Sequence, residues 1–145
     1  MKQSKKEIEL NHNAIDLYNI VLNIEEYPDY IPWCTKIEIL NRKKNIMKAN
    51  MIVNYRFFPT QEFISKIEFN EKDKMIKTSY IKGPLKNLNT RWEFKQLNKK
   101  KSNVLFTIEF EFKSFFHQKL AELFFPLIEV NMIDSFIKRA ENILD

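Results

Sequence analysis

The sequence predicts an α+β fold in which a curved antiparallel sheet packs against a long C-terminal helix. Three observations predict it. Apolar and polar residues alternate over several stretches of the central chain, short charged segments separate these stretches, and residues 114–144 follow a helical apolar spacing. One-sided alternation with short connections is typical of antiparallel strands, and a repeat of three and four residues is typical of helices.

The composition indicates one folded domain. A chain of 145 residues has the size of a single domain with one core, and we interpret residues 1–145 as one unit. A content of 44% hydrophobic and 14% aromatic residues is typical of a folded chain. The one cysteine, Cys34, excludes an intrachain disulfide framework and a multi-cysteine zinc site. The one glycine, Gly83, excludes the glycine-rich loops that bind phosphates and dinucleotides.

A first helix is expected after a short strand at residues 6–10. Asn13 can cap this helix with its side chain. Apolar residues then follow at helical spacing, at Ile15, Tyr18 and Leu22. The helix should end before Tyr27-Pro28, because the residue before a proline avoids the helical region.

The strands that form the sheet are expected in consecutive hairpins. Charged turns at 41–45, 70–74 and 98–102 each separate two alternating stretches. We expect about six to seven strands in total. The stretches that predict them are 6–10, 36–40, 47–57, 61–69, 75–81, 91–95 and 104–112.

The C-terminal residues predict one long amphipathic helix, with a kink or break at Pro126. Between 120 and 132 the helix is apolar nearly all round. A helix packed on a sheet needs only one apolar face, so the surplus predicts contact with a ligand, a partner or a membrane. A sheet and helix with so many large apolar side chains can enclose a cavity, and composition fits a filled core equally well.

The residue types that catalysis needs are sparse. His12 and His117 have no acidic or cysteine neighbour at metal-ligand spacing, so we expect no metal site. Cys34 fits a small buried side chain better than a nucleophile. Glu109 and Glu111 share one strand face, and we interpret them as solvated rather than as an acid/base pair. The residues therefore predict no enzyme.

The net charge of +5 permits an acidic partner without identifying one. Basic residues gather in two of the turns, where they fit solvated hairpin tips better than phosphate contacts. These residues are Arg42, Lys43, Lys44, Lys99, Lys100 and Lys101. Readers of nucleic acid interleave aromatic and basic residues on one face, whereas here the aromatic residues alternate along strands. No DNA partner is expected.

A short proline-containing segment carries a family resemblance. Residues 27–34, Tyr-Pro-Asp-Tyr-Ile-Pro-Trp-Cys, strongly resemble the Y-P-x-F-x-P-W-C signature of the coenzyme Q-binding START-like family, which is related to polyketide cyclase-like proteins. Weaker landmarks follow in family order at 83–85, 110–114 and 136–140. Tyr30, Leu85 and Ser135 depart from the usual Phe, Phe and Ala of that family. The similarity covers nearly the whole chain.

The resemblance implies a helix-grip (START-like) fold, in which the sheet wraps around the C-terminal helix. It also implies non-enzymatic binding of ubiquinone or a similar apolar lipid between sheet and helix, in support of respiratory electron transport as a quinone chaperone. Ubiquinone would be a bound ligand, with no separate cofactor. The side chains expected to line the cavity are Tyr30, Trp33, Phe57, Phe63, Tyr80, Trp92, Phe94, Phe124, Ile128 and Met132.

The same resemblance carries an alternative function. Close homologues in the family are described as ribosome association toxins, which bind the large ribosomal subunit and block subunit joining. The basic turns would then contact rRNA phosphates. A cyclase or hydrolase is a third hypothesis, by fold analogy alone. The charged first ten residues favour a cytoplasmic location, and we also consider peripheral contact with the inner membrane.

Overall fold

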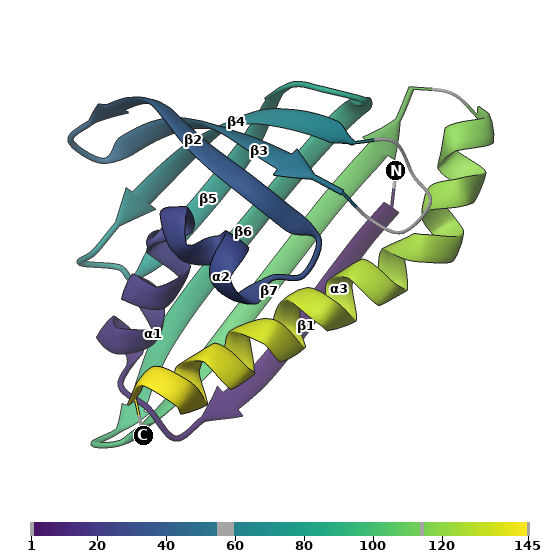
Figure 1. Cartoon of the computed structure of the whole chain (residues 1–145). Helices are drawn as coiled ribbons and strands as arrows, with labels where there is room; N and C mark the ends of the chain where they lie inside the picture. Colours follow the sequence, from purple (N-terminus) through teal and green to yellow (C-terminus); the bar gives the residue numbers. More distant parts are fainter. Residues whose placement is uncertain (1, 55–59, 114, 145) are drawn as a thin grey trace.

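The computed structural model describes the backbone of residues 2–54, 60–113 and 115–144, and their side chains except at 2, 112 and 115–128. Seven strands form one antiparallel sheet, which confirms the predicted fold class (Figure 1). Their order is β1-β7-β6-β5-β4-β3-β2, so β2 to β7 form a meander and β1 pairs with the free edge of β7. The strands are β1 (Lys2–Leu10), β2 (Cys34–Lys43), β3 (Ile46–Val53), β4 (Gln61–Asn70), β5 (Met75–Lys82), β6 (Leu85–Asn98) and β7 (Lys101–Phe112).

The helical elements lie on the concave side of this sheet (Figure 1). They are α1 (Ala14–Leu22), the single 3-10 turn η1 (Ile24–Glu26), α2 (Tyr27–Tyr30) and α3 (Phe115–Leu144). The long helix α3 runs diagonally across the open side of the sheet, and α1 and α2 lie between α3 and strands β2 to β6 (Figure 1). The convex side carries no helix of the described chain.

The start of α1 differs from the prediction in its chemistry. Asn13 does occupy the cap position, but its side chain makes no capping hydrogen bond. The amide of Ala14 instead donates to Oε1 of Gln96 at 2.7 Å, and Nε2 of Gln96 donates to Oδ1 of Asn13 at 3.3 Å. A side chain from β6 therefore satisfies the first free amide of α1.

The first helix ends at Leu22, before Tyr27-Pro28 as predicted, and Tyr27-Pro28 then begins the short helix α2. A proline in the first turn costs no hydrogen bond, because the amide there has no helical partner. The chain does not break at Pro126, since α3 is one helix from Phe115 to Leu144, and the alternative of a kink there stays a prediction. A single proline removes one backbone hydrogen bond, and the helix continues on both sides of it.

The core lies between the sheet and the two longer helices. Aromatic rings form its centre: the ring centroids of Trp92 and Phe106 are 4.5 Å apart, and those of Trp92 and Phe136 are 5.2 Å apart. Tyr18 of α1 meets Phe94 edge to face at 6.1 Å. These pairs join α1 and α3 to the middle of β6 and β7.

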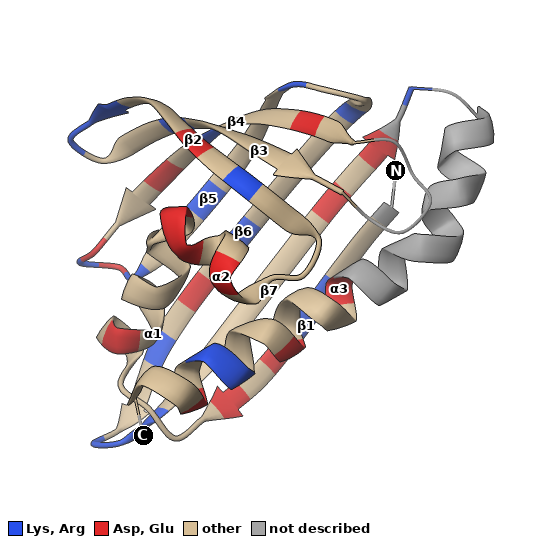
Figure 2. Cartoon of the chain, viewed as in Figure 1, with Lys and Arg blue, Asp and Glu red and all other residues tan. Residues whose placement is uncertain are grey.

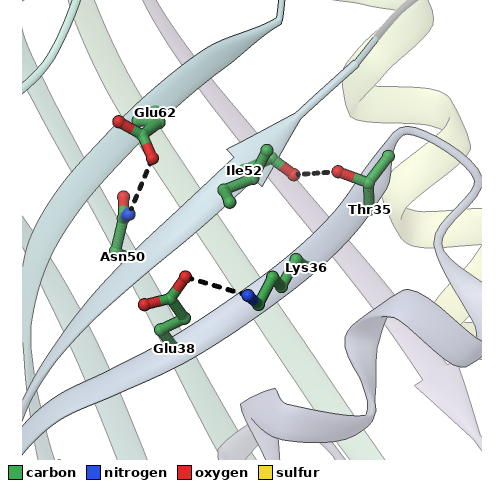
Figure 3. Close-up of polar contacts among 6 residues, drawn as sticks. All are labelled: Thr35, Lys36, Glu38, Asn50, Ile52 and Glu62. Carbon is green, nitrogen blue, oxygen red and sulfur yellow. Dashed lines mark hydrogen bonds and ion pairs between the residues drawn. The ribbon is translucent and has the colours of Figure 1, made fainter.

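Polar side-chain contacts link β2 to β3 and β3 to β4 (Figure 3). Its pairing with β3 is irregular between Cys34 and Lys36, and there the hydroxyl of Thr35 donates to the carbonyl of Ile52 at 3.1 Å. Nδ2 of Asn50 donates to Oε1 of Glu62 at 3.2 Å and so ties β3 to β4. The Thr35 hydrogen bond therefore holds the start of β2, which follows the signature segment, against β3.

Candidate functional site

Along the central strands, burial of the concave face is uneven. Ile76, Trp92 and Phe106 are neighbours across β5, β6 and β7, and they are 2%, 6% and 2% exposed. One step further along the same face, Thr78, Thr90 and Ile108 are only half-buried. The concave face is therefore tightly covered next to α1, less covered at Thr78, Thr90 and Ile108, and covered again at Leu85 and Phe110.

The less covered part of the concave face carries several hydroxyl groups. Thr78 and Thr90 are direct register partners, and Ser65 is the partner of Tyr80 on the neighbouring strand pair. The hydroxyl oxygen of Tyr80 accepts a hydrogen bond from the amide of Leu85 at 2.9 Å. Burial raises the pKa of Tyr80, and this amide donor opposes the rise. Tyr80 therefore stays a neutral phenol whose proton is available to donate.

A second apolar cluster forms around the signature segment. Its buried members are Ile31, Trp33 and Cys34, with Met51, Val53 and Met132 packed against them. Nε1 of Trp33 is buried and has no hydrogen-bond partner among the described residues, which is rare for a buried donor. The cluster brings together α2, the start of β2, the concave side of β3 and the middle of α3.

Ionisation in this cluster is suppressed by burial. Loss of solvent around Cys34 raises the pKa of its thiol to about 11, although a backbone hydrogen bond from Lys36 opposes the change. Burial also raises the pKa of Tyr30 well above its ordinary value, and the nearby Arg139 guanidinium offsets only part of this. Both groups are therefore neutral at physiological pH.

The predicted lining residues fall into three groups. Trp92 and Phe94 are buried within the core and pack on Phe106, Tyr18 and Phe136. Tyr30, Trp33 and Met132 belong to the second cluster, and Phe63 and Tyr80 are half-buried on the concave face. Phe57 and the side chains of Phe124 and Ile128 lie outside the described residues.

Sequence reasoning missed the smaller residues of the concave face. Thr78, Thr90 and Met51 occupy inward positions at mid-strand, where the face is least covered. The period of two along each strand could have identified them, because each lies two residues from a buried position. It also missed Glu129 of α3, which is buried and has its Oε1 atom 3.8 Å from Nζ of Lys6.

Charged residues lie on the strands, on the helices and at the hairpin tips (Figure 2). A shallow convex groove of about 650 Å³ crosses β1, β7, β6 and β5, and its walls include Lys5, Arg91, Glu93 and Glu109. Glu111 lies beside Lys86, with 3.6 Å between Oε1 and Nζ. This groove is polar and faces away from the helices, so it does not provide the apolar surroundings that a lipid needs.

The described residues contain neither a cluster of metal ligands nor a helix that could span a membrane. No group of three or more His, Cys, Asp or Glu residues within residues 2–54, 60–113 and 115–144 could hold a metal ion. In the same part of the chain, none of the helices is long and apolar enough to cross a membrane.

Comparison with known proteins relates the chain to one family and to two kinds of relative. The sequence pattern described as polyketide cyclase / dehydrase and lipid transport matches residues 10–137. The chain is 29% identical to the mitochondrial coenzyme Q-binding protein COQ10 homolog B of Xenopus laevis, over 92% of this chain and 56% of that protein. It is 30% identical to the coenzyme Q-binding protein COQ10 of Dictyostelium discoideum, over 93% and 67%. The chain thus spans little more than half of the frog protein.

The second kind of relative is a ribosome association toxin. The chain is 23% identical to the ribosome association toxin RatA of Pseudomonas aeruginosa, over 92% of each chain. Among solved structures, the Zhui aromatase/cyclase of Streptomyces sp. R1128 matches with a TM-score of 0.90 at 12% identity, over 99% of this chain and 96% of that one. A START superfamily protein from Mycobacterium smegmatis matches with a TM-score of 0.79 at 18% identity, over 97% of both. These structures confirm the START-like fold.

Proposed function

Because the chain belongs to the polyketide cyclase / dehydrase and lipid transport family, we propose that it binds ubiquinone or a similar apolar lipid between the concave face and α3. In this proposal the protein catalyses no reaction and acts as a quinone chaperone in support of respiratory electron transport. The observation that carries the proposal is the uneven burial of the concave face. Side chains such as Ile108 and Thr90 point to the helix side of the sheet and are still only half-buried.

The chemistry of this region fits an apolar ligand with a neutral polar group. Met51, Phe63 and Ile108 supply apolar surface from β3, β4 and β7. Tyr80 and Trp33 supply neutral hydrogen-bond donors, which suit a carbonyl oxygen. The names of two relatives, which describe coenzyme Q binding, support ubiquinone as the first ligand to test.

The test is to count quinone molecules bound per protein. The protein is purified from a quinone-producing host, extracted with organic solvent and analysed by mass spectrometry, and the stripped protein is then titrated with decylubiquinone. We expect Ile108→Trp to reduce bound quinone about ten-fold, because the larger ring fills the less covered part of the concave face. Leu105→Trp, on the convex face of the same strand, is the matched control and should bind as the original chain does.

Two results would overturn the proposal. One is a chain that carries no quinone and takes up none on titration. The other is an Ile108→Trp variant that keeps its circular dichroism spectrum and still binds quinone at the original level. The non-enzymatic part of the proposal has its own test. Incubation with quinones and with aromatic polyketide analogues should leave their masses unchanged.

Binding to the large ribosomal subunit is a second candidate function. It is supported by the similarity to a ribosome association toxin and by the two basic tips, β2–β3 with Arg42, Lys43 and Lys44, and β6–β7 with Lys99 to Lys101. Both tips lie at the same end of the sheet (Figure 2). The order of strands separates them by four strand spacings, or about 19 Å along the sheet.

The β4–β5 turn lies between the two basic tips and carries Glu71 and Asp73 beside Lys72 and Lys74. The basic surface along this end of the sheet is therefore interrupted. Co-sedimentation with large subunits over a range of salt concentrations tests this second candidate. The double change Lys43→Glu/Lys44→Glu should release the protein, and Lys82→Glu/Lys113→Glu, the same charge change at the opposite end, should not. Association that ignores salt, or no association, would remove this function.

A further inference from the structure

Three hydroxyl-bearing side chains form a strip across the concave face. Thr78 and Tyr80 lie two residues apart on β5 and so share one face, and Thr90 is the register partner of Thr78 on β6. Apolar side chains surround the strip on the same face, with Ile76 and Trp92 below it and Ile108 beside it. A ligand made only of hydrocarbon would gain nothing from hydroxyls at this place.

The hydroxyls of this strip have hydrogen-bonding capacity left over. The oxygen of Tyr80 accepts from the amide of Leu85, and within the described residues its proton has no acceptor, so it can donate to another group. Within the described part of the chain, the structure gives no side-chain hydrogen bond to either Thr78 or Thr90. Polar groups that a bound ligand covers are nearly always hydrogen-bonded. A ligand lying on this strip must therefore offer oxygen atoms to it.

We propose that Thr78, Tyr80 and Thr90 form the subsite that receives an oxygenated ring, so that the site selects prenylated quinones over hydrocarbons of similar size. This inference rests on the proposed lipid-binding function and specifies which end of the ligand lies where. The ring lies on the hydroxyl strip, and the hydrocarbon tail extends along the apolar surface of β3 and β4. A site built to bond ligand oxygens rejects an analogue without them, because its own polar groups are then left unpaired.

Threonine also favours strands for reasons of packing alone, and this simpler explanation must be separated from the proposal. Valine has the shape of threonine without the hydroxyl, so Thr78→Val/Thr90→Val keeps the packing and removes the hydrogen bonds. Thr107 of β7 is the matched control. It lies on the convex face, opposite Arg91, where no ligand is proposed.

The experiment measures two dissociation constants for each variant, by equilibrium dialysis with detection by mass spectrometry. The probes are decylubiquinone and dodecylbenzene, which have similar tails and differ in the oxygens of the ring. We expect Thr78→Val/Thr90→Val to weaken decylubiquinone about ten-fold, as two lost hydrogen bonds would do, and to bind dodecylbenzene more tightly, because no hydroxyl is then left unpaired. Thr107→Val should change neither constant. Thr78→Ser keeps a hydroxyl at this position and should therefore keep the preference for the quinone.

The outcomes separate this inference from the proposed function. If the original chain binds both probes and the valine variant binds both as before, the strip does not select the ligand and the inference is wrong. The same holds if the valine variant loses both probes equally, since the threonines then act by packing. If the original chain binds neither probe, the lipid-binding function itself fails, and the subsite falls with it.

Discussion

The hydroxyl oxygen of Tyr80 occupies space that a side chain at Gly83 would need. A β-carbon built on Gly83 would lie 2.9 Å from this oxygen and 2.8 Å from the backbone carbonyl oxygen of Glu62. Gly83 also has φ +155°, which side-chain-bearing residues rarely adopt. The turn between β5 and β6 therefore needs glycine, and the same turn holds Tyr80 in place on the concave face.

Gly83→Ala should lower the free energy of unfolding by about 2–3 kcal/mol, because it combines backbone strain with a close contact. Urea denaturation measures the change. The double variant Gly83→Ala/Tyr80→Phe should recover little, since the Glu62 carbonyl and the backbone conformation remain. Full recovery in the double variant would show that the tyrosine hydroxyl is the only obstacle.

Ser102 makes a second contact whose removal has a defined cost. Its side chain is fully buried, and its hydroxyl donates to the carbonyl of His12 at 2.6 Å, which fastens the loop before α1 to β7. Ser102→Ala should lower the free energy of unfolding by about 1–2 kcal/mol, because the hydrogen bond between β7 and the loop before α1 is lost. Ser79→Ala, on the convex face, should stay within about 0.5 kcal/mol in the same urea titration. Equal effects at both positions would contradict this assignment.

The sheet could be predicted from the sequence because its signals are local. A period of two fixes which residues share a face, and charged turns mark the hairpins. The cap of α1 shows where local reasoning stops. The position of Asn13 was predicted, but the atom that meets the first amide belongs to Gln96, 82 residues away. A helix cap is predicted from the few residues around the helix start, and a contact with a distant residue cannot be predicted from them.

The residues that line the candidate site are also hard to predict from local sequence. Large aromatic residues were expected to line a cavity, yet Trp92 and Phe94 pack against each other and against Tyr18 and Phe136. Alternation predicts that a residue points inward and does not tell how closely a helix covers it. Coverage depends on where α1 and α3 lie along the strands. The less covered positions therefore include Thr78 and Thr90, which hydrophobicity alone does not select.

The signature segment is joined to α3 by one arginine. Nη2 of Arg139 lies 3.0 Å from Oε2 of Glu26, and its guanidinium lies 5.1 Å from the centre of the Tyr30 ring. Double-mutant cycles with Arg139→Lys, Glu26→Gln and Tyr30→Leu should give coupling energies of about 0.5–1 kcal/mol for each pair. The lysine keeps the charge and lacks the planar group, so a cycle with no coupling would mean that the planar group of Arg139 adds nothing to either contact.

The thiol of Cys34 offers a direct probe of burial near the proposed site. Burial raises its pKa to about 11 from an ordinary value of 9.0, and Cys34 is the one cysteine of the chain, so any thiolate signal belongs to it. Below pH 9 the thiol is protonated in both the folded and the unfolded chain. Between pH 9 and 11 the unfolded chain loses this proton first, so this group makes folding less stable as pH rises. Cys34→Ala should remove that part of the alkaline decline.

Alkylation by iodoacetamide tests the same pKa without unfolding the protein. The thiolate is the reactive form, so at pH 8 the native chain should react about 100-fold more slowly than the chain in urea, from the shift of pKa alone. The native rate should rise with pH until about pH 11. A native rate equal to the unfolded one would mean that Cys34 is open to solvent and that the cluster around Trp33 is not closed. A ligand that covers this cluster should slow the alkylation further. Cys34 therefore reports binding near β2, away from the hydroxyl strip on β5 and β6.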